Sequence, residues 1–114
     1  MSKEKTLHIL WTTDNADTAR FMVLFYAANS MTNRLWDHVT VILWGAAVKL
    51  AVENEAVQEE IKIAQHAGVK LSACGSCARR YGVAEDLEDL GIEVGAWVGP
   101  FTEMVKSGEP IIYV

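Results

Sequence analysis

Two cysteines are the residues of this sequence best suited to chemistry. Cys74 and Cys77 form a single C-x-x-C, with glycine and serine between them. In a reducing compartment, such a pair serves a chemical or metal-binding role more often than a structural disulfide. The spacing therefore indicates a reactive thiol, a redox dithiol or half of a metal site.

The elements around this pair predict where it lies. The β-rich run Val69–Ala73 precedes Cys74, and a short helical stretch ended by Gly82 follows it. In open α/β sheets, reactive groups lie outside the carboxyl ends of the strands. A helix N-terminus also favours the thiolate, which is the nucleophilic form of cysteine. We therefore expect Cys74, as the first helical residue, to react at neutral pH. Arg80, three residues after Cys77, is expected to add positive potential.

Several chemical interpretations compete at this site. A thioredoxin-like dithiol has the same spacing, but its motif follows an early strand, whereas three predicted strands come before Cys74. A zinc site needs four ligands, and the three histidines of the chain, His8, His38 and His66, have no paired spacing. We therefore predict no metal. A sulfur carrier needs one thiolate that accepts a sulfane sulfur as a persulfide. The opposing interpretation treats both cysteines as small packed hydrophobes.

The rest of the chain alternates β-rich runs with helical stretches, and we interpret residues 1–114 as a single domain. This alternation predicts a five-stranded, mostly parallel sheet within a three-layer α/β/α sandwich. The predicted strands are Thr6–Thr12, Val39–Trp44, Val69–Ala73, Ile92–Val94 and Pro110–Val114.

The helical stretches carry their own signals. Asn54 is expected to start a helix with an inner stripe of Val57, Ile61 and Ala64, and Gly68 is expected to end it. Asp14 or Asp17 is expected to cap an earlier helix. The inner stripe predicted for that helix is Phe21, Leu24, Phe25 and Ala28.

Two segments carry no charged residue, Phe21–Asn33 and Val39–Val48. A surface helix of a monomer normally shows a polar face. A contact between subunits would bury an uncharged surface of this length, so we predict a homo-oligomer.

Composition excludes several function classes. Hydrophobic residues make up 51% of the chain and charged residues 22%, which excludes a disordered protein. A net charge of −5 without a basic stripe excludes nucleic-acid binding. The apolar stretches are far shorter than the ~20 residues of a membrane span. No secretory signal and no phosphate-binding glycine motif are recognisable, so we expect a cytoplasmic protein without a nucleotide cofactor.

Residues 71–83, Leu-Ser-Ala-Cys-Gly-Ser-Cys-Ala-Arg-Arg-Tyr-Gly-Val, resemble the cysteine segment of DsrE/DsrF-like sulfur-relay proteins. The resemblance extends to the first strand with Thr12-Thr13-Asp14, to Val39–Gly45 and to the last strand. It implies an α/β/α domain with a five-stranded parallel sheet, assembled as a trimer or hexamer.

The resemblance also implies a function. Cys74 matches the persulfide-bearing cysteine of the family, which implies a sulfur carrier or sulfurtransferase with sulfur donor and acceptor proteins as partners. Trp44-Gly45 and Trp97–Pro100 are candidate walls of the sulfur pocket. The alternatives are a non-catalytic oligomeric interaction module with packed cysteines, and thiol–disulfide exchange through Cys74 and Cys77.

Overall fold

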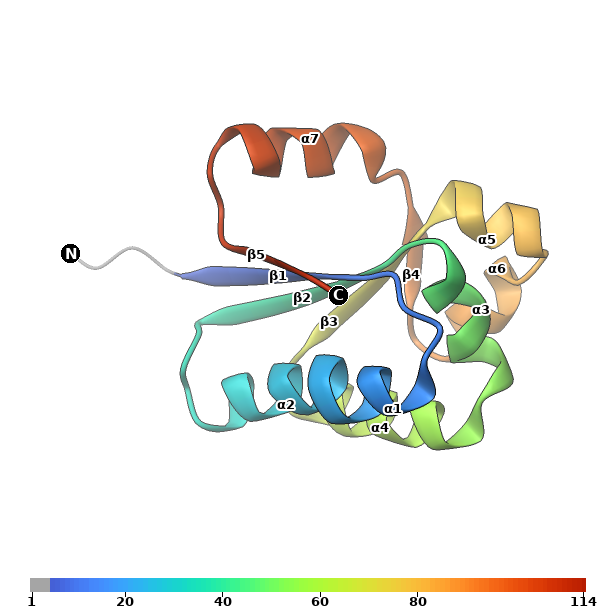
Figure 1. Cartoon of the computed structure of the whole chain (residues 1–114), viewed down its shortest axis with the longest axis horizontal. Helices are drawn as coiled ribbons and strands as arrows, with labels where there is room; N and C mark the ends of the chain where they lie inside the picture. Colours follow the sequence, from blue (N-terminus) through green and yellow to red (C-terminus); the bar gives the residue numbers. More distant parts are fainter. Residues whose placement is uncertain (1–4) are drawn as a thin grey trace.

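The protein forms one parallel sheet with helices on both faces, as seen in a computed structural model that describes residues 5–114 (Figure 1). The sheet has the strand order β4-β3-β2-β1-β5, and every neighbouring pair is parallel. The strands are β1 (Thr6–Trp11), β2 (His38–Leu43), β3 (Lys70–Cys74), β4 (Glu93–Gly95) and β5 (Ile111–Tyr113). The predicted α/β/α fold class is thus confirmed. The interpretation of the first residues as lacking a signal falls on residues 1–4, outside the described part.

The helical segments connect these strands in order. They are α1 (Ala16–Thr18), the π-helix η1 (Ala19–Leu24), α2 (Phe25–Thr32), α3 (Ala46–Glu53), α4 (Glu55–His66), α5 (Gly75–Tyr81), α6 (Ala84–Asp89) and α7 (Val98–Lys106). Within residues 5–114, no helix is both long and apolar enough to cross a membrane.

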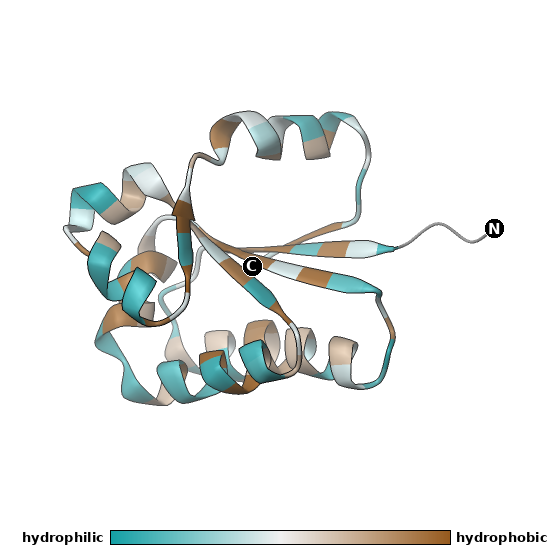
Figure 2. Cartoon of the chain, turned by 180° about the vertical axis from the view of Figure 1, so that it is seen from behind, coloured by the Kyte–Doolittle hydropathy of each residue, from teal (hydrophilic) through white to brown (hydrophobic). Residues whose placement is uncertain are grey.

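The two faces of the sheet are covered unequally. The segment α1–η1–α2 and helix α4 lie against one face, whereas α7 alone lies over the other (Figure 1). Helices α3, α5 and α6 gather near the carboxyl ends of the strands. The helices therefore cover the two faces to different extents, and brown hydrophobic bands repeat along the strands between them (Figure 2).

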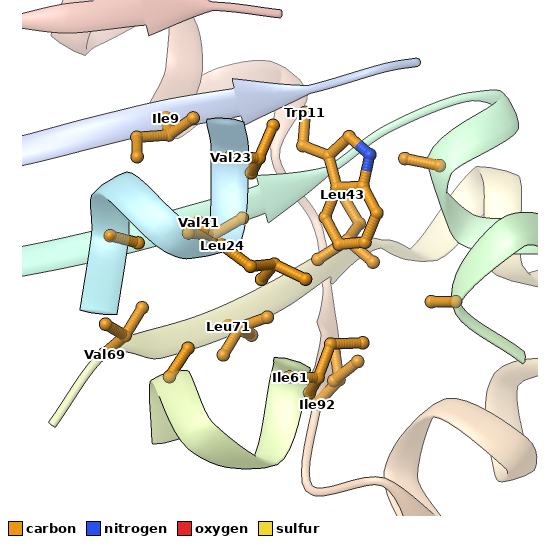
Figure 3. Packing of buried hydrophobic residues seen from close by; sticks show 14 of the residues in the cluster. Ile9, Trp11, Val23, Leu24, Val41, Leu43, Ile61, Val69, Leu71 and Ile92 are labelled. Atoms are coloured by element: carbon orange, nitrogen blue, oxygen red, sulfur yellow. The ribbon is translucent and has the colours of Figure 1, made fainter. Parts of the chain in front are cut away.

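The main core lies on the face that carries η1 and α4. Side chains that alternate along β1 to β3 point into it, because successive strand residues face opposite sides of a sheet. In Figure 3, strand residues such as Ile9, Val41 and Leu71 lie beside Leu24 of η1 and Ile61 of α4. The strand residues of the cluster are Leu7, Ile9, Trp11, Val39, Val41, Leu43, Leu71 and Ala73. On the other face, Ile42 of β2 and Met104 of α7 are buried.

Helix α4 matches its prediction. Asn54 caps it, and its side-chain oxygen accepts a hydrogen bond from Val57 N at 3.0 Å. The predicted stripe of Val57, Ile61 and Ala64 is fully buried. Gly68 follows the helix with a φ of +103°, which glycine adopts without strain.

The helix after β1 differs from its prediction. Its cap is Asn15, which accepts from Thr18 N at 2.9 Å, and not Asp14 or Asp17. Phe21 and Phe25, predicted to point inward, are 59% and 60% exposed. The physical reason is the π-helical phase of η1. Its wider turns rotate the side chains away from the 3.6-residue pattern on which the prediction relied. The residues that pack inward are Ala19, Val23, Leu24, Ala27 and Ala28.

Helix α7 starts at Val98, so Gly99 and Pro100 form part of its first turn. Proline is compatible with that position because the first turn of a helix needs no N–H donor.

Candidate functional site: a cysteine at the carboxyl edge of the sheet

Cys74 is the last residue of β3 and the N-cap of α5. It lies one residue before the helix, whereas the sequence predicted it to be the first helical residue. Ala73 points into the main core, so the alternation of β3 turns Cys74 and Ser72 to the face that carries α7. Cys74 is buried, and both cysteines are free thiols. Cys74 therefore lies at the carboxyl edge of the sheet, as the strand-to-helix junction predicted.

Cys77 lies in the first turn of α5, just after β3, and its side chain contacts the loop that follows β2. Its Sγ accepts a hydrogen bond from the backbone N–H of Gly45 at 3.3 Å. Gly45 follows β2 and adopts φ +65° and ψ −133°, a conformation open essentially to glycine alone. The loop after β2 is thus held in a shape that aims its N–H at the sulfur of Cys77.

Several contacts set the acidity of Cys77. Burial raises the pKa of its thiol above the ordinary 9.0, and the Gly45 hydrogen bond opposes that rise. A side-chain hydrogen bond with Cys74 and the charge of Cys74 raise the pKa further. The positive charge of Arg80 lowers it, as the sequence predicted for this residue. Because the causes that raise the pKa prevail, Cys77 stays protonated at neutral pH.

A cavity of about 300 Å³ opens beside Cys74. Its walls come from the start of α5, from β4 and from the connection that leads into α7. Part of the predicted wall is thus present, since Trp97 and Gly99 belong to the lining, whereas Pro100 lines a neighbouring cavity. The lining residues are Cys74, Gly75, Ser76, Arg79, Val94, Gly95, Ala96, Trp97, Val98 and Gly99.

Gly75 allows the start of α5 to approach β4 closely. A Cβ added at this position would lie 3.3 Å from the carbonyl oxygen of Gly95 and 3.2 Å from Nη1 of Arg79. A side chain at position 75 would therefore be too close to Gly95 and Arg79, which explains why glycine stands between Cys74 and Ser76. The backbone at the start of α5 forms one side of the cavity.

Trp97 and Phe101 attach helix α7 to the sheet. The indole Nε1 of Trp97 donates a 2.8 Å hydrogen bond to Oγ of Ser72, which itself donates to the Glu93 carbonyl at 3.2 Å. Phe101 makes an edge-on contact with Trp44, with ring centroids 5.5 Å apart. Trp44 therefore holds α7 in place and does not line the cavity, which differs from its predicted role.

The remaining candidates from the sequence do not line the Cys74 cavity. Thr12 and Thr13 share the carboxyl edge of the sheet with Cys74, but their hydroxyl groups bond to Val114 and Asn15. His8 faces Glu109, with 3.7 Å between Nε2 and Oε1. Within residues 5–114, no group of three or more His, Cys, Asp or Glu side chains is arranged to hold a metal ion.

Two residues of the site were missed from the sequence, Arg79 and Ser72. Arg79, not its predicted neighbour Arg80, lines the cavity of Cys74. A signal existed for Arg79, because it lies four residues after Gly75 and hence on the same helix face. Ser72 offered no such signal, since its partner Trp97 is 25 residues away in the chain.

The geometry defines a small parallel α/β protein with a free cysteine in a cavity at the carboxyl edge of its sheet. The sequence matches the model of the DsrE/DsrF-like family over residues 5–113. This chain therefore belongs to the DsrE/DsrF-like family, which is generally linked to sulfur relay.

Solved structures share this fold. A conserved protein of unknown function from Bacteroides thetaiotaomicron, BT1422, is 43% identical with a TM-score of 0.93, over 96% of this chain and 95% of its own. The ychN protein of E. coli is 17% identical with a TM-score of 0.72, over 98% and 100% of the two chains. MTH1491 of Methanobacterium thermoautotrophicum, of unknown function, is 19% identical with a TM-score of 0.71, over 99% and 100%. A search of curated proteins finds no match.

Proposed function

We propose that this protein accepts sulfane sulfur on Cys74 as a persulfide and passes it to an acceptor thiol. The observation that carries the proposal is the position of Cys74, a free thiol in the wall of a cavity of about 300 Å³. In this proposal the protein acts in the cytoplasm, a reducing compartment that keeps both cysteines as free thiols. The domain that performs it is the whole chain, since the cavity draws on β3, β4 and the connection to α7.

The transfer needs no external oxidant. The Cys74 thiolate attacks the outer sulfur of a donor persulfide, the donor S–S bond breaks, and the donor thiolate leaves with the electron pair. The outer sulfur is then bound to Cys74. An acceptor thiolate attacks that outer sulfur in a second step, which regenerates the Cys74 thiolate. Partly enclosed walls limit the access of other reductants to the persulfide.

Cys77 takes the role of a neutral hydrogen-bond partner in this proposal. Its thiol stays protonated at neutral pH, accepts the Gly45 N–H and interacts with Cys74. A protonated Cys77 can donate its S–H to the Cys74 thiolate and stabilise it. Cys77 is therefore a positioning residue for the transfer and need not carry sulfur itself.

Intact mass spectrometry after incubation with a persulfide donor tests the proposal. We expect the wild type to gain the mass of one sulfur atom, and a reductant to remove it. Cys74→Ser should not load, whereas Cys77→Ser should, because its hydroxyl keeps a donor beside Cys74. If Cys74→Ser loads and Cys77→Ser does not, the two roles are reversed. If no variant and no wild type loads, the packed-thiol interaction module is the better account.

Thiol–disulfide exchange is the second candidate, and the contact between the two sulfurs favours it. A dithiol enzyme needs both cysteines, because the second thiol resolves the mixed disulfide. Either serine variant would then stop turnover, and the wild type would cycle through a Cys74–Cys77 disulfide. A carrier instead retains uptake in Cys77→Ser.

The exposed apolar surface supports a homo-oligomer, which we propose to be a trimer or hexamer. Phe21, Met22 and Phe25 lie on the outer side of η1 and α2, within the uncharged segment, and are 59%, 36% and 60% exposed. Light scattering at micromolar concentration should give a multiple of 12.6 kDa. The double substitution Phe21→Ser/Phe25→Ser should lower the mass, and the exposed Ile63→Ser on α4 serves as the control. A wild type of only 12.6 kDa contradicts the assembly.

A further inference from the structure

The charge around the Cys74 cavity is uneven. Arg79 is the charged residue among those that line the cavity, and no carboxylate belongs to the lining. A second cavity of about 410 Å³ shares the wall formed by Val94 to Trp97. The lining of that cavity includes the acidic residues Glu88 and Glu93 and no basic residue. Positive and negative side chains are thus sorted to opposite sides of one shared wall.

The guanidinium of Arg79 is free to bind a ligand. Within residues 5–114, its side chain forms no hydrogen bond and no ion pair with another residue. It folds back along α5, with Nη1 3.2 Å from the Cβ position of Gly75, the residue next to Cys74. A larger residue at position 75 would crowd this guanidinium. The fold therefore places an exposed, unpaired guanidinium beside Gly75, the residue that follows Cys74.

We infer that Arg79 makes the Cys74 cavity selective for small sulfane-sulfur donors that carry an anionic group beside the reacting sulfur. The inference rests on the proposed function. A guanidinium binds the oxygens of sulfonate-like or carboxylate groups through its fork of N–H donors. Donors of this charge are repelled from the neighbouring cavity by Glu88 and Glu93.

Thiosulfate is the simplest donor of this class. The Cys74 thiolate attacks its outer sulfur, the S–S bond breaks, and sulfite leaves with the electron pair. The outer sulfur stays on Cys74 as a persulfide, so atoms and charge balance without a further reactant. Arg79 is a specificity residue in this step, because it holds the oxygens of the leaving group while Cys74 reacts.

A pair of alkylating probes tests Arg79 without sulfur transfer. Iodoacetate and iodoacetamide are similar in size, but only iodoacetate is anionic. The ratio of their rates at Cys74, measured by peptide mass spectrometry, should fall about two- to fivefold in Arg79→Gln, the range expected for one partly solvated ion pair. Arg79→Lys should keep most of the ratio. The matched control is Arg80→Gln, which removes the same charge from a residue outside the cavity lining.

Three results would overturn the inference. They are an unchanged ratio in Arg79→Gln, an equal fall in Arg80→Gln, and an equal loss of rate with both probes. Loading from thiosulfate supplies the second measurement, and Arg79→Gln should slow it by a similar factor while a neutral trisulfide still modifies Cys74. If the wild type loads from no donor at all, the proposed function fails, and the probe ratio alone then decides the role of Arg79.

Discussion

The two faces of the sheet differ in how closely helices cover them. One face carries η1, α2 and α4, and its inward residues, such as Ile9 and Leu43, are completely buried. The other carries α7 alone, together with Ser72, Cys74 and the cavities beside them. The densely covered face holds the fold together. The sparsely covered face has cavities at the carboxyl edge, so the main core and the candidate site lie on opposite faces of one sheet.

The largest expected effect comes from truncating the densely covered face. Leu43→Ala should lower the free energy of unfolding by about 2–5 kcal/mol, because it leaves a hole in a closely packed core. Thr40→Ala is the control on the same strand, since Thr40 points to the other face and its loss should cost within about 1 kcal/mol. Urea unfolding measures both. An equal loss of unfolding free energy in the two variants would show that the two faces contribute equally to stability.

The next effect concerns the attachment of α7. Ser72→Ala removes the hydrogen-bond acceptor of the Trp97 indole and should destabilise the protein by about 1–3 kcal/mol. Combining it with Trp97→Phe should cost less than the sum of the two single losses, because both remove the same bond. Strict additivity of the double variant would show that this bond does not hold α7.

A smaller effect is expected at the start of α4. Asn54→Ala removes the side-chain cap of the helix and should cost about 0.5–2 kcal/mol. Glu59→Ala, on the exposed side of the same helix, should change the free energy of unfolding by less than about 0.5 kcal/mol. A loss in Asn54→Ala no greater than in Glu59→Ala would contradict the capping role.

The smallest effect is a pH dependence at Cys77. Because burial and Cys74 raise the pKa of its thiol, alkylation of Cys77 should reach half its maximal rate only above pH 9.0, and Cys77 should lag behind Cys74. The raised pKa of Cys77 also makes the free energy of unfolding depend on pH. The thiol form favours folding below the ordinary pKa, and this contribution declines as pH rises through the higher folded value. Peptide mass spectrometry gives the profile, with urea-unfolded protein as the control. Identical profiles would contradict the shift.

Much of the fold could be predicted because its signals are local. The strands could be recognised from their runs of apolar and β-branched residues. Helix α4 could be recognised from its cap, Asn54, and from its inner stripe of Val57, Ile61 and Ala64. The helix after β1 could not be predicted in the same way. Its π-helical turns change the period, so Phe21 and Phe25 face outward although their spacing fits an ordinary inner stripe.

The sequence by itself determined the parallel α/β class and the place of Cys74 at a strand-to-helix junction. Both follow from residue order within one or two elements, where backbone geometry fixes which neighbours meet. Only the tertiary structure decided two contacts of the site, namely Ser72 with Trp97 and Cys77 with Gly45. These contacts depend on strand order and on the path of α7, which join residues 25 and 32 positions apart. No local pattern encodes such pairings, because they arise when the sheet assembles.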